Sequence, residues 1–331
     1  MTYQDILIFW YTVNLMDTLE ILKALSDETR IRILLLLFYE PLHVSEILEI
    51  LNMGQSRISR HLKILQDAKI LSAARDGARI YYGISPEFRI HPLYDSIIQL
   101  KEFQEKDHFW NEELKNLFRT DQKRLFELLE KRKSATIAFF EKFGDLLELN
   151  QNQYVDSEYY RKKIIELLPD KVSVCVEPGC GTGWVSVELI HYVNKLICID
   201  QSKSSLNKLQ ERLKKDSRNK IELVHAPMEE MPIKDELADL VILSMALHHT
   251  PNINRVLKET YRILKFGGHL IIAELEQHNI EEMRKKFADF WLGFHVEELK
   301  KELSNINFKG IETYKGKGKG LLNCIFLKCT K

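Results

Sequence analysis

The spacing of apolar residues along the chain changes twice, near residue 96 and near residue 150. Before the first change, apolar residues recur at helical spacing and then in two short alternating runs, which predicts small helices and a hairpin. Between the changes the chain is charged and poor in glycine and proline, which predicts long helices. Beyond residue 150, strand-like apolar runs alternate with helical stretches, as in a mostly parallel α/β sheet. We therefore expect three parts, residues 1–96, 97–150 and 151–331.

The first part begins with a long helical pattern. Apolar residues from Tyr3 to Glu40 are spaced every three or four positions, which predicts two or more amphipathic helices. Ser26 or Asp27 is a suitable N-cap for the second of them, because either side chain can accept a hydrogen bond from the first turn.

A helix-turn-helix pattern and a hairpin follow. Val44 to Leu51 and Gln55 to Ala68 predict two short helices, and Gly54 between them is expected to adopt the left-handed conformation of a tight turn. Ile70 to Ala73 and Ala78 to Ile84 predict two strands joined by an Asp-Gly turn. A hairpin directly after the second helix predicts a winged helix.

The second predicted helix has one apolar face and one polar, cationic face. A DNA-recognition helix needs this division, because its polar face meets base edges and phosphates. The segment from Gly54 to Tyr81 holds six lysines and arginines against two aspartates, so it is locally basic. An ordinary solvated helix face is the alternative interpretation. The predicted DNA contacts are Gln55, Ser56, Arg57, Ser59, Arg60 and Lys63 on the helix, and Arg75 and Arg79 on the wing.

Two segments, ILKALSDETRIRILLLL and VSEILEILNMGQSRISRHLKILQDAKILSAARDGARIYYGIS, resemble the ArsR/SmtB-type winged-helix repressors over about eighty residues. The resemblance implies a double-stranded DNA operator as partner and a homodimer. The stretch Ile6 to Trp10 and the helix after Pro92 could supply the dimer surface, or could pack on the rest of the chain. Metal sensors of that family carry Cys-x-Cys where this chain has His43 and Ser45, so we predict no metal there.

A glycine-rich turn marks the third part. The strand-like run Val172 to Val176 leads into E-x-G-x-G-x-G, from Glu177 to Gly183, and then into a predicted helix. Glycines let the backbone approach a ligand, and free N–H groups at a helix start can bind its carboxylate or phosphate. Asp200 ends the next strand-like run, where an acid binds ribose hydroxyls. The glycine spacing alone is weak evidence for a ligand.

Further motifs follow in order: MEEMPIKDELADLVILSMALHH, RVLKETYRILKFGGHLIIAEL and HNIEEMRKKFADFWLGF. With the glycine turn, they resemble the UbiE-like branch of class I methyltransferases over about 170 residues. The resemblance implies S-adenosylmethionine as cofactor, or S-adenosylhomocysteine as ligand. It places Glu177 near the amino group of the ligand, with Gly179, Cys180, Gly181 and Gly183 along the methionine end, Asp200 on the ribose, Gln201 and the Met228 backbone at the adenine, and Ser244 near the sulfonium.

The chain departs from the methyltransferase pattern at the adenine end. An acid usually precedes the position of Met228, and here that residue is Pro227, with Glu229 the nearest substitute. His248, His249 and His278 follow predicted strands at the mouth of such a sheet, and are candidates to act as a base or to orient a methyl acceptor. A structural role for the histidine pair is the alternative. No cysteine triad for a metalloid substrate is present in the motifs.

The bulk composition adds little to these motifs. The 331 residues hold 48 lysines and arginines against 48 acids, so the net charge favours no class of partner. The run ILLLLF is too short to span a bilayer, the first residues lack a signal-peptide pattern, and the five cysteines form no C-x-x-C pair. We expect a cytoplasmic protein with reduced core cysteines and no membrane association.

Together these patterns predict a multidomain α plus α/β fold: a winged helix-turn-helix, a helical linker and a Rossmann-like methyltransferase fold with an antiparallel edge hairpin. The predicted function is an ArsR-type transcriptional regulator whose second module methylates an unidentified acceptor. The alternative is a non-catalytic repressor in which that module only senses S-adenosylmethionine or S-adenosylhomocysteine and changes the affinity for DNA.

Overall fold

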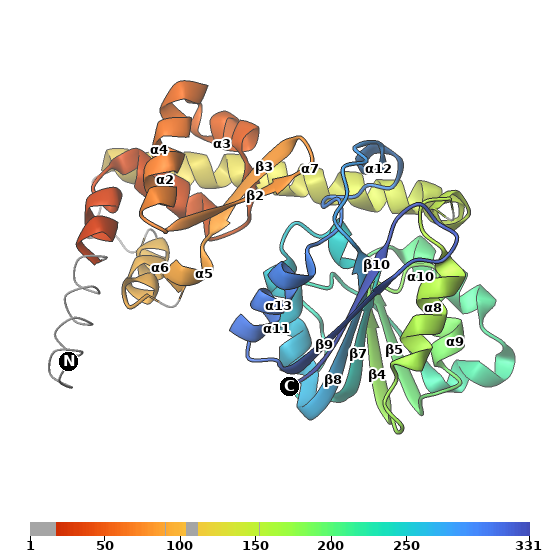
Figure 1. Ribbon diagram of the computed structural model, residues 1–331. Coiled ribbons are helices and arrows are strands. Elements are labelled where there is room, and N and C mark those ends of the chain that lie inside the picture. Colours follow the sequence, from red (N-terminus) through yellow and green to blue (C-terminus); the bar gives the residue numbers. More distant parts are fainter. Residues whose placement is uncertain (1–17, 90, 104–111, 152) are drawn as a thin grey trace, which may run out of the picture. The chain divides into compact units, whose positions relative to one another are not determined.

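The computed structural model describes residues 18–89, 91–103, 112–151 and 153–331. The chain divides into two compact units, residues 1–132 and 133–331, and helix α7 (Glu112–Gln151) runs across the division (Figure 1). The stretch Ile6 to Trp10, proposed for dimerisation, lies outside the described residues. No helix of the described ranges is long and apolar enough to cross a membrane.

Unit 1 is a winged helix-turn-helix. After a helix at residues 18–25 come α2 (Glu28–Leu37), β1 (Leu42–His43), α3 (Val44–Leu51), α4 (Gln55–Asp67), β2 (Leu71–Asp76), β3 (Arg79–Ile84), α5 (Pro86–Arg89) and α6 (Leu93–Phe103). The three strands form an antiparallel sheet in the order β1-β3-β2. Strands β2 and β3 are the predicted wing, with Asp76 opposite Arg79 and Gly77 at φ +60° in the turn.

Capping explains where the helices of unit 1 begin. Asp27 is the N-cap of α2, and its carboxylate accepts a hydrogen bond of 3.1 Å from the Arg30 backbone N–H. The prediction for the interhelical turn was wrong in one respect. Asn52 has the left-handed conformation, at φ +52°, whereas Gly54 is extended at φ −70° and is the N-cap of α4. Asparagine tolerates the left-handed region better than other side chains, so the turn does not need glycine there.

The first half of α7 belongs to the core of unit 1. Leu125 is fully buried in the same cluster as the apolar face of α4. Asp121 accepts two hydrogen bonds from the Arg32 guanidinium, at 2.6 and 2.8 Å, and both side chains are buried. Arg124 donates to the Ile50 carbonyl at 2.9 Å. This part of α7 is therefore tied to α2 and α3 by charge as well as by packing.

Unit 2 is a seven-stranded sheet in the order β6-β5-β4-β7-β8-β10-β9. The strands are β4 (Val174–Pro178), β5 (Lys195–Asp200), β6 (Ile221–His225), β7 (Ala238–Ser244), β8 (Leu264–Leu275), β9 (Lys309–Gly316) and β10 (Cys324–Thr330). Strands β4 to β8 pair in parallel, and β10 pairs antiparallel with both β8 and β9. The predicted antiparallel edge hairpin is confirmed.

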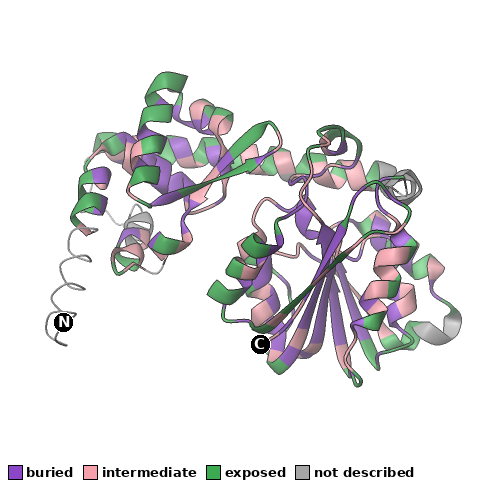
Figure 2. Ribbon diagram, in the orientation of Figure 1, coloured by how far each residue is buried: buried purple, intermediate pink, exposed green. Residues whose placement is uncertain are grey.

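Helices cover both faces of this sheet. Helices α8 (Ser157–Glu166), α9 (Ser186–Leu189) and α10 (Lys203–Arg212) lie on one side, and α11 (Ile253–Ile263) and α13 (Val296–Asn305) on the other (Figure 1). The central strands are buried between them, whereas the edge strand β9 and the outer faces of the helices are exposed (Figure 2). Shorter elements are η1 (Lys215–Lys220), η2 (Leu247–His249) and α12 (Glu282–Lys286). In this arrangement ligands bind at the carboxyl ends of the parallel strands.

Candidate functional site

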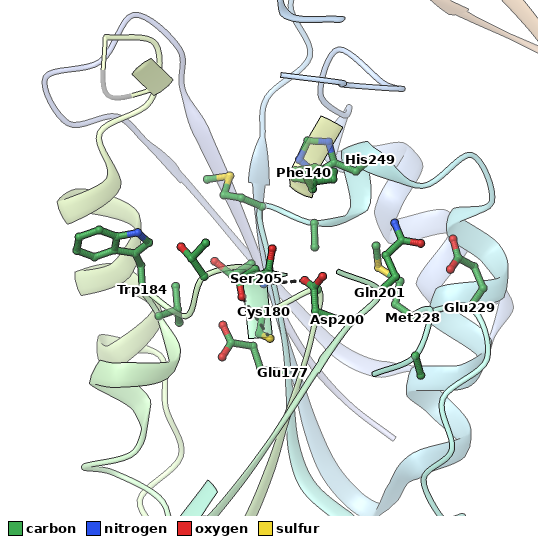
Figure 3. Close-up of a pocket in the computed structure, with 18 of the residues that line it drawn as sticks. Phe140, Glu177, Cys180, Trp184, Asp200, Gln201, Ser205, Met228, Glu229 and His249 are labelled. Carbon is green, nitrogen blue, oxygen red and sulfur yellow. Dashed lines mark hydrogen bonds between the residues drawn. The ribbon is translucent and has the colours of Figure 1, made fainter. Parts of the chain in front are cut away.

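A pocket lies at the carboxyl ends of β4, β5 and β7 and encloses about 1060 Å³ of empty space, including its open mouth. Figure 3 shows Glu177, Cys180 and Asp200 at its centre, with Trp184 at one side and Met228 and Glu229 at the other. Of the residues predicted to bind the cofactor, all but Gly183 line this pocket: Glu177, Gly179, Cys180, Gly181, Asp200, Gln201, Met228 and Ser244.

The glycine-rich turn is held close to β5. The N–H groups of Gly179 and Cys180 both donate to the Ile199 carbonyl, at 2.7 and 3.1 Å. Gly181 has φ +53°, and a Cβ added to it would meet no atom within 4 Å, so its backbone borders open space. Gly183 differs, because a Cβ there would lie 2.1 Å from the side chain of Leu209. The turn thus uses one glycine to leave room in the pocket and another for packing.

The helix after this turn is shorter than the sequence suggests. Helix α9 has only four residues, Ser186–Leu189, and no side-chain cap. The predicted use of a helix N-terminus to bind the charged end of a ligand therefore has no support, because so short a helix has almost no dipole. Individual backbone N–H groups of the turn remain beside the pocket.

Asp200 is fixed at the end of β5. Its carboxylate accepts hydrogen bonds of 2.8 Å from the Gly181 N–H and from the Ser202 N–H. Burial raises the pKa of this carboxyl group above its usual value, and the two backbone hydrogen bonds oppose the rise. A carboxylate has further lone pairs, so Asp200 can still accept from hydroxyls of a ligand.

Glu177 is buried at the bottom of the pocket. Burial raises the pKa of its carboxyl group to about 8, although a hydrogen bond from the Ser186 hydroxyl opposes the rise. At neutral pH the group is therefore largely protonated in the empty site. Ser244 Oγ, also in the pocket, is buried and has no hydrogen-bond partner among the described residues.

The three predicted catalytic histidines have different surroundings. Only His249 lines the pocket, where its ring contacts Phe140 edge to face at a centroid distance of 4.9 Å (Figure 3). His248 is 1% exposed and its Nδ1 lies 2.7 Å from Glu274 Oε2. His278 does not line the pocket, and its Nδ1 accepts from the Ile280 N–H at 3.2 Å.

The pKa values of these three histidines also differ. Burial lowers the pKa of His248, but the Glu274 and Asp289 carboxylates outweigh it and raise that pKa to about 9. Burial and then the neighbouring His248 hold the pKa of His249 well below its usual value. Burial also lowers the pKa of His278 to about 4. At neutral pH one imidazole of the pair is charged and the other neutral.

Several pocket residues were absent from the sequence prediction. Thr182, Trp184, Val185 and Ser205 lie close to the motifs, so the glycine turn and the helix after β5 could have indicated them. Phe140 on α7 and Tyr160 on α8 precede every motif and carry no local signal. Glu229, the suggested substitute acid, lines the pocket and accepts a hydrogen bond from the Thr250 hydroxyl.

The predicted DNA-binding residues are all exposed on unit 1. Ile58, Leu62 and Leu65 of α4 are fully buried, which leaves the opposite face of the helix to solvent. His61 is buried as well, with its Nδ1 3.6 Å from Asp27 Oδ1. The exposed predicted residues are Gln55, Ser56, Arg57, Ser59, Arg60, Lys63, Arg75 and Arg79.

His43 lies where metal-sensing repressors carry a cysteine, and its role in capping α3 accounts for it. His43 is the N-cap: its Nδ1 accepts from the Ser45 N–H at 3.2 Å, and Glu46 accepts from the His43 N–H at 2.8 Å. The ring therefore has a local structural role that explains its presence.

Two family models match separate parts of the chain. The model described as "Bacterial regulatory protein, arsR family" matches residues 27–73, and the model described as "Methyltransferase domain" matches residues 176–272. The first range covers the helix-turn-helix and the start of the wing. The second covers the strands and turns that form the pocket.

Curated relatives are demethylmenaquinone methyltransferases. That of Oceanobacillus iheyensis is 32% identical over 111 residues, which are 33% of this chain and 47% of that protein. That of Listeria welshimeri is 28% identical over 136 residues, 40% of this chain and 58% of that protein. The chain thus spans about half the length of these relatives. Among solved structures, a Thermotoga maritima S-adenosylmethionine-dependent methyltransferase described as a possible histamine N-methyltransferase is 24% identical, with a TM-score of 0.47; the match covers 59% of this chain and 99% of that one.

The pocket fits the cofactor that the methyltransferase match implies. Gly181 leaves open space that a side chain would fill, the Asp200 carboxylate keeps lone pairs that can accept from hydroxyl groups, and Ser244 offers a buried hydroxyl with no partner among the described residues. The methyltransferase domain accordingly indicates binding of S-adenosylmethionine or S-adenosylhomocysteine. The chain contains an ArsR-family helix-turn-helix domain, matched at residues 27–73, and a methyltransferase domain, matched at residues 176–272.

Proposed function

We propose that the protein is a DNA-binding transcriptional regulator whose second domain transfers the methyl group of S-adenosylmethionine to an acceptor. The proposal for DNA rests on the exposed polar and cationic face of α4, which lies opposite a fully buried apolar stripe. Such a face can reach base edges, while Arg75 and Arg79 of the wing contact phosphates. As ArsR-type regulators do, the chain is expected to act as a homodimer in the cytoplasm.

Within the pocket, Asp200 would hold the ribose, and Gln201, with the backbone at Met228, would contact the adenine. The turn from Gly179 to Gly181 would follow the methionine end of the ligand. S-adenosylmethionine supplies the reactive methyl group, and the protein positions it against the acceptor. His249 is the predicted catalytic histidine that would touch the acceptor, because it lines the pocket. His248 and His278 would act as positioning residues.

One observation favours the non-catalytic alternative. The three carboxylates that line the pocket, Glu177, Asp200 and Glu229, all accept hydrogen bonds from the protein itself. Carboxylates held in this way are less available to act as a general base toward a methyl acceptor. In that case the domain would sense S-adenosylmethionine or S-adenosylhomocysteine, and the bound ligand would change the affinity for DNA.

Three measurements test these functions. DNA duplexes selected by the protein from a random pool would define an operator, and calorimetry would give the affinity for each cofactor form. Operator affinity would then be measured with each form at one salt concentration, because phosphate contacts depend strongly on salt. If the cofactor changes the affinity for DNA but a broad acceptor screen yields no methylated product, the proposed methyl-transfer activity is refuted. Failure to bind either cofactor form would refute both functions of the pocket.

A further inference from the structure

Two histidines and one aspartate cluster beside the pocket. His248 Nε2, His249 Nδ1 and a carboxylate oxygen of Asp289 lie within 4.8 Å of one another. We propose that these three side chains bind a divalent transition-metal ion, and that Zn²⁺ is its occupant. This site goes beyond the proposed function, since it does not require that the domain transfers a methyl group.

The distances suit an ion better than direct hydrogen bonds. His248 Nε2 and His249 Nδ1 each lie 3.8 Å from Asp289 Oδ1. Hydrogen bonds between nitrogen and oxygen span only about 2.7–3.2 Å. Nitrogen and oxygen ligands lie about 2.0–2.2 Å from zinc, so two ligands of one tetrahedral ion are roughly 3.4 Å apart. Asp289 Oδ1 therefore needs to move only a few tenths of an ångström toward each imidazole nitrogen, and rotation of the two rings, whose nitrogens lie within 4.8 Å of each other, would complete the set.

His248 is oriented as metal-binding histidines commonly are. Its Nδ1 lies 2.7 Å from Glu274 Oε2, and Glu274 is fully buried and also accepts from the Leu247 N–H at 2.7 Å. A carboxylate on one ring nitrogen fixes the ring and directs the other nitrogen to the metal. His248 Nε2 is buried and has no hydrogen-bond partner among the described residues, although it is directed at Asp289. A buried polar atom without a partner is costly, and an ion that displaced the proton of this nitrogen would satisfy it.

The two segments that carry the ligands are fixed to each other. The N–H groups of Phe290 and Trp291 both donate to the His248 carbonyl, at 2.8 and 3.0 Å. The Trp291 indole N–H donates to the Thr250 carbonyl at 2.8 Å. His249 Nδ1 makes one long hydrogen bond of 3.4 Å with the Ala288 carbonyl, which an ion bound to this nitrogen would replace.

The ligand set defines the class of metal. Two imidazoles and one carboxylate suit zinc and similar first-row ions, and three protein ligands leave a coordination position open. Because His249 also lines the pocket, an ion held here would lie beside the space that is left for an acceptor. All three ligands lie within quoted sequence motifs, His248 and His249 in one and Asp289 in another, but the motifs do not record that these two segments meet in space.

Cobalt binding tests the site directly. Tag-free full-length protein, stripped with a chelator, is titrated with Co²⁺, and its visible d–d absorption is recorded before and after addition of Zn²⁺. We expect one Co²⁺ per chain, displaced by Zn²⁺. His249→Gln and Asp289→Asn should each weaken binding at least about tenfold, since even outer partners of a metal site contribute about 10- to 100-fold.

The matched control is His295→Gln, which removes an exposed histidine of the same unit. Circular dichroism confirms that each variant is folded, and His249→Gln alone decides the question if Asp289→Asn is not. Binding lost in His249→Gln and kept in His295→Gln supports the site. Absence of stoichiometric Co²⁺ or Zn²⁺ binding, or equal affinity in the two histidine variants, overturns it.

Discussion

Gly183→Ala is expected to destabilise unit 2 strongly, although the glycine does not line the pocket. Its φ of +82° is unfavourable for any residue with a side chain, at about 1–2 kcal/mol. The added Cβ would lie 2.1 Å from Cδ1 and 2.8 Å from Cγ of Leu209, which is fully buried. Overpacking of this kind costs about 1–3 kcal/mol. The free energy of unfolding should therefore fall by about 2–5 kcal/mol, measured by urea denaturation followed by circular dichroism.

Two further variants separate packing from ligand binding. Leu209→Ala makes room for the new methyl group, so the double variant should lose less free energy of unfolding than the sum of the single variants. Gly181→Ala meets no neighbouring atom and should cost only about 1–2 kcal/mol from its φ of +53°, yet it fills the pocket and should weaken cofactor binding. If Gly183→Ala unfolds like the wild type, or if Leu209→Ala relieves none of its cost, the proposed collision is wrong.

The remaining predictions concern charges. Arg60→Ala should weaken operator binding by about 1–3 kcal/mol in a fluorescence titration, and an unchanged affinity would mean that α4 is not the recognition helix. Asp200→Ala should weaken S-adenosylmethionine binding by about 1–3 kcal/mol in calorimetry, because a hydrogen-bonded charge is lost; equal binding would refute the ribose contact. Asp121→Asn should lower the free energy of unfolding by up to about 3–5 kcal/mol, since it leaves the buried Arg32 guanidinium only the more exposed Glu28 carboxylate, at 3.6 Å, as countercharge; a urea midpoint like that of the wild type would contradict this. Glu177, with a pKa of about 8 in the empty site, should ionise when the cationic ligand binds. Affinity should then rise from pH 6 to pH 8 with release of a proton, detected by calorimetry in two buffers, and Glu177→Gln should abolish that dependence.

Local signals made the winged helix predictable. The Asp-Gly turn, the apolar stripe of α4 and the acid at the N-cap of α2 all act within a few residues of one another. The same local reasoning misplaced the left-handed residue, because Asn52 and Gly54 can both fill such a turn and only the exit direction of α3 decides between them. The length of α9 also depended on packing that no short motif records.

The part of the pocket that lies at neighbouring strand ends was predictable from the sequence. The part contributed by segments distant in sequence was not. Gly181 and Asp200 lie on consecutive strand ends, so parallel pairing alone brings them together. Phe140, by contrast, reaches His249 from a helix that precedes the whole sheet in sequence. Asp289 approaches the histidine pair through backbone hydrogen bonds between loops, which hydrophobic spacing does not encode.

The unbroken course of α7 has a practical consequence for cutting the protein into parts. Leu125 is buried in the core of unit 1, whereas Phe140, only a few turns later on the same helix, lines the pocket of unit 2. A fragment that ends before α7 would expose the apolar surface that Leu125 covers, and one that begins after it would open the wall of the pocket. Separately expressed halves would each have to carry their own share of this helix, divided near Arg132.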